Sequence, residues 1–160
     1  MFNPTKPAVL ASPDLELKAI YSRSLKSAQS LDQKVDLYSD DSGAGKTYHD
    51  LLLREDIQAV IIALPILNQP EHIEAALAAG KHVLSEKPVS ADVKRAEHLI
   101  THSKGLAKNG ATWAVAENFR FIDSVIYGRE AVAKLGKIHG FRIKLAVNVE
   151  PGTKYFGMSQ

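Results

Sequence analysis

Short apolar runs rich in branched residues alternate along this chain with longer segments of helical period, and this alternation restricts the fold more than any other feature. The clearest run, "QAVIIAL" at residues 58–64, is continuously apolar, as strands buried on both faces tend to be. A helical pattern opening near Pro70 and ending at Gly80 follows it, and a second apolar run covers residues 81–85. Repeated strand–helix–strand units predict an α/β protein with a parallel sheet.

The same patterns predict the other elements of the chain. Ser90 is the expected N-cap of the longest helix. We expect strands at residues 15–21, 35–38, 58–64, 81–85, 112–116 and 138–149, and helices at residues 24–31, 48–54, 70–80, 90–109 and 124–135.

Composition excludes several classes of protein. With 45% apolar and 24% charged residues among 160, the chain is typical of globular domains. The net charge of +2 is spread over scattered lysines, so a nucleic-acid partner is not expected. The longest apolar run, near residues 59–67, is too short to span a bilayer. No leader pattern opens the chain, which makes the cytoplasm the default location.

Three short motifs lie at the ends of the first, third and fourth predicted strands. They are "SRS" (Ser22, Arg23, Ser24), "LP" (Leu64, Pro65) and "EKP" (Glu86, Lys87, Pro88). Open parallel sheets bind ligands at the carboxyl ends of their strands. Any one of these features alone is more often structural, but together they favour a dinucleotide site.

The first of these strand ends favours NADP(H) over NAD(H). In dinucleotide folds an acidic residue at this position accepts from the ribose 2'-hydroxyl, whereas an arginine among small hydroxyl residues suits a 2'-phosphate. Here Ser22, Arg23 and Ser24 occupy the strand end, with Lys26 close by. A guanidinium binds phosphate through charge-assisted, bidentate hydrogen bonds.

The order "VIIALP", "HIEAALAAGKHVLSEKPVS" and "VAENFRF" resembles the N-terminal half of the Gfo/Idh/MocA oxidoreductases over roughly residues 8–150. This resemblance implies hydride transfer between a nicotinamide and an alcohol or ketone of a sugar-like or diol substrate. It places Lys87 beside the nicotinamide and the substrate oxygen, where an ammonium stabilises a developing alkoxide. Pro88 would fix the turn, through a cis bond in relatives, and Asn118 and Arg120 would face the substrate.

The resemblance also implies that Leu64 and Pro65 lie along the dinucleotide and that Glu86 supports its nicotinamide end. Arg120 has the alternative role of pairing with a helix terminus. No metal is expected, since His98 and His102 lack a third ligand in sequence. "SGAGKT" at residues 42–47 lacks the first glycine of a P-loop and is interpreted as a turn.

The chain departs from the family pattern at both ends. Its opening segment matches only the end of the family's first helix, so the first strand and the glycine loop are missing from the resemblance. In the strand order 3-2-1-4-5-6 that strand is central, and we therefore expect two flanking strands with unpaired edges and marginal folding or association. The helix that carries the likely proton donor in relatives would lie after residue 160.

These departures define the predicted organisation. We expect an incomplete doubly wound parallel sheet of Rossmann type over residues 1–120, followed at residues 121–160 by the start of a C-terminal α+β domain. The predicted function is an NADP-dependent oxidoreductase fragment with little activity alone. The alternative is a non-catalytic nucleotide-binding or interaction fragment that forms a homo-oligomer or pairs with a full-length relative.

Overall fold

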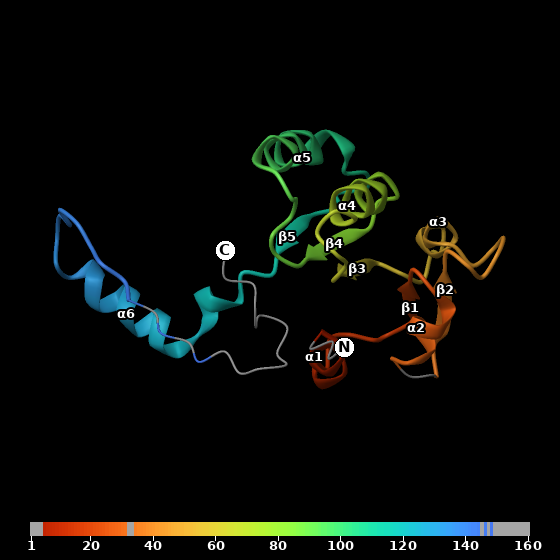
Figure 1. Ribbon diagram of the computed structural model, residues 1–160, viewed down its shortest axis with the longest axis horizontal. Helices are drawn as coiled ribbons and strands as arrows, with labels where there is room; N and C mark the ends of the chain where they lie inside the picture. Colours follow the sequence, from red (N-terminus) through yellow and green to blue (C-terminus); the bar gives the residue numbers. More distant parts are fainter. Residues whose placement is uncertain (1–4, 32–33, 145, 147, 149–160) are drawn as a thin grey trace. The chain divides into compact units, whose positions relative to one another are not determined.

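A computed structural model describes residues 5–31, 34–144, 146 and 148 (Figure 1). Helices and strands alternate through most of it, in the order α1 Thr5–Ala11, β1 Ala19–Ser22, α2 Leu25–Gln29, β2 Asp36–Ser39, α3 Tyr48–Leu52, β3 Ala59–Ile62, α4 Gln69–Ala78, β4 His82–Ser85, α5 Val93–Leu106 and β5 Trp113–Val115, with a 3-10 helix at Asn118–Phe121 and α6 Asp123–Ala133. The predicted α/β class is confirmed.

The five strands form two parallel sheets rather than one. The first sheet pairs β1 with β2, in a register that places Ile20 opposite Leu37. The second has the order β3-β4-β5 and aligns Val60 with Val83. In the described residues no strand lies between β1 and β3, so both strands keep one unpaired edge, as the sequence predicts.

The two sheets run in the same direction. Lys18, just before β1, lies near enough to Asp56, just before β3, to lower the pKa of its carboxyl group. The amino ends of β1 and β3 therefore lie close together. At the other end, the Tyr21 hydroxyl of β1 lies 3.5 Å from the Nε2 atom of His72, in the first half of the helix that follows β3. The carboxyl ends of β1 and β3 therefore open toward the same side, as a dinucleotide site requires.

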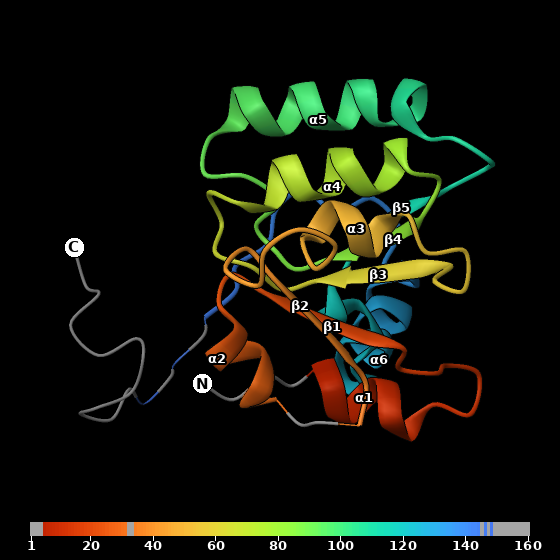
Figure 2. The same cartoon turned by 90° about the vertical axis from the view of Figure 1, so that its right-hand side faces the viewer.

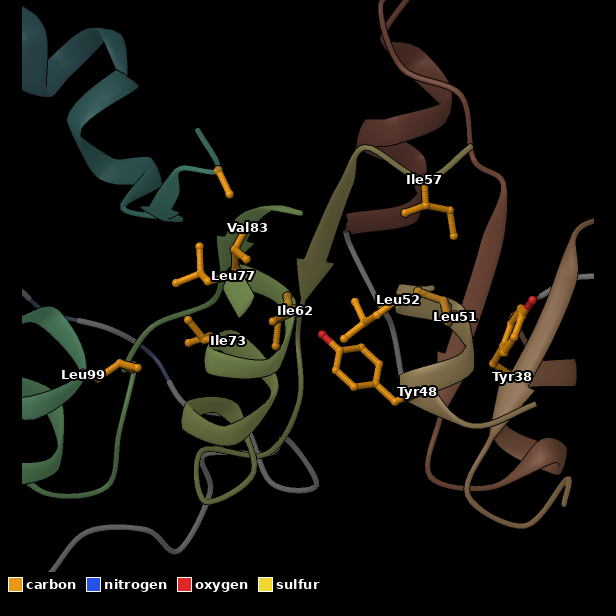
Figure 3. Packing of buried hydrophobic residues seen from close by; sticks show 12 residues of the cluster. Tyr38, Tyr48, Leu51, Leu52, Ile57, Ile62, Ile73, Leu77, Val83 and Leu99 are labelled. Atoms are coloured by element: carbon orange, nitrogen blue, oxygen red, sulfur yellow. The ribbon is translucent and has the colours of Figure 1, made fainter. Parts of the chain in front are cut away.

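Helices lie on both sides of the strands within residues 1–117 (Figure 2). In that view α3, α4 and α5 lie above the strands and α1 and α2 lie below them. Ile73, Leu77 and Leu99 are fully buried between α4, α5 and the second sheet, and Figure 3 shows the apolar cluster to which they belong. The opposite face of this sheet exposes Ile61 and Leu84.

Three aromatic or imidazole rings connect the two sheets. Tyr48 of α3 lies between Tyr21 of β1 and His72 of α4, with ring centroids 5.0 Å and 4.6 Å apart respectively. The Tyr48 hydroxyl also donates to the backbone carbonyl of His72 at 3.0 Å. Because β1 and β3 share no hydrogen-bond ladder, side-chain packing of this kind carries much of the contact between the sheets.

The structure corrects several predicted boundaries. The strand predicted at residues 15–21 begins only at Ala19, and the run at 58–64 shortens to Ala59–Ile62. The long strand predicted at residues 138–149 is wrong for residues 138–144, 146 and 148, which form no strand. An apolar alternation alone does not make a strand, because the ladder needs a partner and no described strand pairs with this segment.

The N-cap of the longest helix is also different from the prediction. Asp92, not Ser90, caps α5, and its side chain accepts a hydrogen bond from the backbone N–H of Arg95 at 2.8 Å. Ser24, the first residue of the helix predicted at residues 24–31, is the N-cap of α2, and Gly80 adopts a left-handed conformation (φ +76°) after α4.

Removing the true cap should destabilise the protein more than removing the predicted one. Asp92→Ala is expected to lower the free energy of unfolding by about 1 kcal/mol, because an N–H of the first turn loses its acceptor. Ser90→Ala is the matched control and should change it by less than about 0.5 kcal/mol. Urea unfolding of both variants measures the difference, and equal losses would contradict the assignment of the cap.

The chain divides into two compact units, Met1–Glu117 and Asn118–Gln160. The first contains both sheets, and the second contains the 3-10 helix and α6. Among the described residues, no helix combines the length and apolarity needed to cross a bilayer.

Candidate cofactor and substrate site

The carboxyl end of β1 presents an exposed arginine beside a helix N-terminus. The strand ends at Ser22, Arg23 extends into solvent, and Ser24 caps α2 by accepting from the backbone N–H of Ser27 at 3.3 Å. Arg23 forms no ion pair with another described residue. A cation with this freedom can turn toward a phosphate without first breaking an existing salt bridge.

Two aspartates after β2 also reach this end of the sheet. Asp41 accepts from the backbone N–H of Leu25, the first residue of α2, at 2.7 Å and from the Ser39 hydroxyl at 2.6 Å. These hydrogen bonds, that from Ser39 first, hold the pKa of Asp41 below its usual range. Sequence reasoning missed this carboxylate because it comes from the neighbouring strand.

Asp40 lies beside the half-buried side chain of Tyr21, on β1. The Tyr21 hydroxyl donates to Asp40 at 2.8 Å. Burial raises the pKa of Tyr21, and the hydrogen bond to Asp40 raises it further. Tyr21 therefore remains a neutral donor, and its ring forms one wall at the carboxyl end of β1.

The loop after β4 carries the predicted catalytic lysine. The Lys87–Pro88 bond is cis, which agrees with what the resemblance implies. Lys87 has an exposed side chain, with a relative accessibility of 39%, and its Nζ atom lies 4.0 Å from the Oε2 atom of Glu117. Glu117 follows β5, and sequence reasoning did not select it.

A buried glutamine holds this loop in place. Gln69, in the first turn of α4, is only 2% exposed, and its Nε2 atom donates to the carbonyl of Pro88 at 2.8 Å. The backbone N–H of Glu86 donates to the carbonyl of Ile62 at 2.8 Å, which joins the ends of β4 and β3. The loop is thus fixed from two neighbouring elements.

The dipeptide after β3 begins the turn into α4. Leu64 is half-buried against the apolar cluster, and Pro65 is exposed, with its carbonyl accepting from the backbone N–H of Asn68 at 2.9 Å. Leu64 and Tyr21 both line a cavity of about 550 Å³ that extends along β1 and β3. The structure thus brings the ends of β1 and β3 to one cavity.

The predicted substrate residues belong to the other unit. Asn118 and Arg120 are exposed residues of the 3-10 helix, and the Arg120 guanidinium lies 5.5 Å from the ring centroid of Phe121.

The two histidines considered as metal ligands, His98 and His102, lie on α5 with their rings stacked and the ring centroids 3.9 Å apart. In the part of the chain that the structure describes, no group of three potential ligands could hold a metal ion.

A family model described as "Oxidoreductase family, NAD-binding Rossmann fold" matches residues 3–115, which contain both sheets. The chain belongs to the Gfo/Idh/MocA oxidoreductase family. The strand-end residues at β1, β3 and β4 all lie within the matched segment, whereas Asn118 and Arg120 lie outside it.

Curated proteins similar to the chain include a dehydrogenase and a sugar reductase. Dehydrogenase FPY6 of Fusarium mangiferae is 40% identical over 156 residues, which cover 94% of this chain and 44% of that protein. The dTDP-3,4-didehydro-2,6-dideoxy-alpha-D-glucose 3-reductase of Actinomadura kijaniata is 32% identical, covering 91% and 42%. The chain therefore spans less than half the length of these relatives.

Solved structures share the fold. A 3-ketoreductase from Actinomadura kijaniata, in complex with NADP and TDP-benzene, superposes with a TM-score of 0.65 at 29% identity, covering 80% of this chain and 38% of that one. The scyllo-inositol dehydrogenase of Lactobacillus casei, with NAD(H) and scyllo-inositol, has a TM-score of 0.65 at 26% identity, covering 81% and 36%. Relatives thus include complexes with either nicotinamide cofactor.

Proposed function

We propose that this chain forms the cofactor-binding part of an NADP(H)-dependent oxidoreductase that acts on an alcohol or ketone of a sugar-like or diol substrate. The observation that carries the proposal is the joint exposure of Arg23 and Lys87 at carboxyl strand ends of a Rossmann-like unit in an oxidoreductase family. We assign residues 1–120 to cofactor binding, residues 121–160 to the start of a substrate domain, and the protein to the cytoplasm.

Each strand end has a separate task in this proposal. Arg23, with the hydroxyls of Ser22 and Ser24, would bind the 2'-phosphate, because a guanidinium matches its geometry. Leu64 and Pro65 would pack along the dinucleotide. The cofactor, when bound, supplies or accepts the hydride.

The loop after β4 would act on the substrate oxygen. Lys87 would donate a hydrogen bond to this oxygen and stabilise its negative charge as the alcohol loses its proton or the ketone gains a hydride. Glu86 and Pro88 would keep the loop at the nicotinamide end. Glu117, whose Oε2 atom lies 4.0 Å from the Lys87 Nζ atom, would orient the ammonium.

An NAD(H)-dependent function is the second candidate, and two observations favour it. Asp40 and Asp41 add negative charge near the end of β1, where it would repel a 2'-phosphate. The solved scyllo-inositol dehydrogenase contains NAD(H). Asp41 already accepts hydrogen bonds from Leu25 and Ser39, and Asp40 accepts one from Tyr21, whereas Arg23 forms no ion pair with another described residue. This difference supports our choice of NADP(H).

The proposal is tested by titrating the chain with NADPH and NADH and following the fluorescence of the reduced nicotinamide. Arg23→Ala should weaken NADPH binding by about 10- to 100-fold, because a charged hydrogen bond to the phosphate is worth about 1.5–3 kcal/mol. Binding of NADH should change less than about twofold, since it lacks the phosphate.

Lys104→Ala is the matched control, because it removes one exposed positive charge in the last turn of α5. It should leave the affinity for both cofactors unchanged. An equal loss of NADPH and NADH affinity in Arg23→Ala would reject the phosphate assignment. Binding of NADPH without turnover of any sugar or diol would favour the non-catalytic alternative.

A further inference from the structure

Gln69 is a buried polar side chain whose amide group is only partly satisfied. It is 2% exposed, and its Nε2 atom donates to the Pro88 carbonyl at 2.8 Å. Its Oε1 atom is buried and accepts no hydrogen bond from another described residue. An unsatisfied amide oxygen is costly to bury, so an apolar side chain of the same size would suit this position better if stability alone decided it. The glutamine therefore has a use beyond filling the core.

The donor end of Gln69 reaches the loop that carries Lys87. Proline has no backbone N–H, so its carbonyl is the only backbone group through which residue 88 can be hydrogen-bonded. On the other side of Lys87, the Glu86 N–H donates to the Ile62 carbonyl at 2.8 Å. Lys87 is thus held between a contact to β3 and a contact to α4.

The helix that carries Gln69 is firmly packed. Gln69 is the first residue of α4, and Pro70 follows it in the first turn. Ile73 and Leu77, further along the same helix, are almost completely buried in the apolar cluster. Groups on a packed helix are positioned more precisely than groups on a loop. Gln69 can therefore act as a fixed point for the Lys87 loop.

The position of the Lys87 ammonium depends strongly on the loop from which it extends. The side chain has a relative accessibility of 39%, and its Nζ atom lies 4.0 Å from the Oε2 atom of Glu117. A pair of exposed charges at this distance restrains a side chain only weakly. The backbone of the loop therefore decides much of where the ammonium lies.

We propose that Gln69 is a positioning residue of the enzyme: its amide N–H holds the Pro88 carbonyl so that the neighbouring Lys87 ammonium reaches the substrate oxygen. Gln69 touches neither substrate nor cofactor in this role and acts through Lys87. The inference rests on the proposed function, which gives Lys87 its task. It goes beyond that function because it makes turnover depend on a buried residue outside the site.

Amide hydrogen exchange of the 160-residue chain tests the contact itself. Gln69→Met keeps the length of the side chain and removes both the donor and the unsatisfied oxygen. The Pro88 carbonyl then has to find water, so the loop opens more often, and exchange of the Glu86 amide should accelerate by about 10-fold. The Val83 amide, which donates to the Thr112 carbonyl, is the internal control and should change by less than about twofold.

Two results of this exchange experiment would overturn the proposal. Equal acceleration at Glu86 and Val83 would show that Gln69 supports the whole fold rather than the loop. Unchanged exchange at both amides would show that the loop does not depend on Gln69.

Kinetics of a complete homologue that has glutamine at this position test the consequence for turnover. The substitution that corresponds to Gln69→Met should lower kcat by about 10-fold and change the Kd for NADPH by less than about twofold, because only the ammonium is displaced. Ile73→Val is the matched control, since it removes a methyl group from the buried face of α4 and no hydrogen bond. It should leave kcat unchanged, and equal kcat values for the two variants would overturn the proposal.

Combination with Lys87→Ala separates this inference from the proposed function. If Lys87→Ala alone leaves kcat unchanged, the proposed function fails and this inference fails with it. If Lys87→Ala lowers kcat and Gln69→Met does not, only this inference fails. If both lower kcat, adding Gln69→Met to Lys87→Ala should cause no further loss, because Gln69 acts through Lys87. Losses that multiply in the double variant would show that Gln69 acts by another route and would overturn the proposal.

Discussion

Replacing the lysine that corresponds to Lys87 by alanine in a complete homologue should lower kcat by about 10²- to 10⁴-fold while changing the Kd for NADPH by less than about threefold. The ammonium is needed when charge develops on the substrate oxygen, and it contributes little to holding the rest of the dinucleotide. Steady-state kinetics with a sugar or diol substrate and a separate cofactor titration measure the two effects.

Alanine at the position of Lys94 is the control for this variant. Lys94 is an exposed lysine in the first turn of α5, and its loss changes the net charge equally. Its kcat should match that of the unmodified enzyme. Equal kcat values for the Lys87 variant and the unmodified enzyme would reject the catalytic assignment. If the affinity for NADPH fell as much as kcat, Lys87 would act by binding the cofactor rather than by polarising the substrate oxygen.

Tyr48→Ala should lower the free energy of unfolding of the 160-residue chain by about 3–5 kcal/mol, the usual cost of truncating a buried aromatic side chain. Tyr48 is only 8% exposed and packs against Tyr21 of β1 and against His72 of α4, the helix that follows β3. The loss is large against a typical total of about 5–15 kcal/mol. Urea unfolding followed by the fluorescence of Trp113, on β5, measures it.

Tyr48→Phe separates ring packing from the hydroxyl. It keeps the ring and loses only the hydrogen bond to the His72 carbonyl, so we expect a cost of about 1 kcal/mol. In Tyr48→Ala, amide exchange in β1 and β2 should accelerate more than in β4, because the contact between the two sheets is weakened. Equal losses in the two variants would show that the ring does not connect the sheets.

Local sequence was sufficient to predict most of the elements. Runs such as "QAVIIAL" and the spacing of Ile73, Ala76 and Leu77 specify a buried strand and a helix face through interactions within a few residues. The same signals could not set the boundaries. Strand length depends on a neighbouring strand, and α5 begins at its Asp92 cap, which competes with Ser90 only a few residues away.

The site shows the same division. The "SRS", "LP" and "EKP" signals lie in sequence at strand ends, and topology rules predict that such ends meet. No comparable sequence motif marked three other residues of the site, because each reaches it from a different element. They are Asp41, Gln69 and Glu117. Their roles depend on hydrogen bonds between segments far apart in the chain.

Periodicity and short motifs are local properties of a chain, and they were sufficient to predict the α/β class, the family and the residues at the strand ends. The division of the strands into two sheets, the contact of Gln69 with the Lys87 loop and the unpaired edges of β1 and β3 became visible only in the folded chain. Strand pairing and burial are interactions between distant segments, so they exist only once the chain has folded.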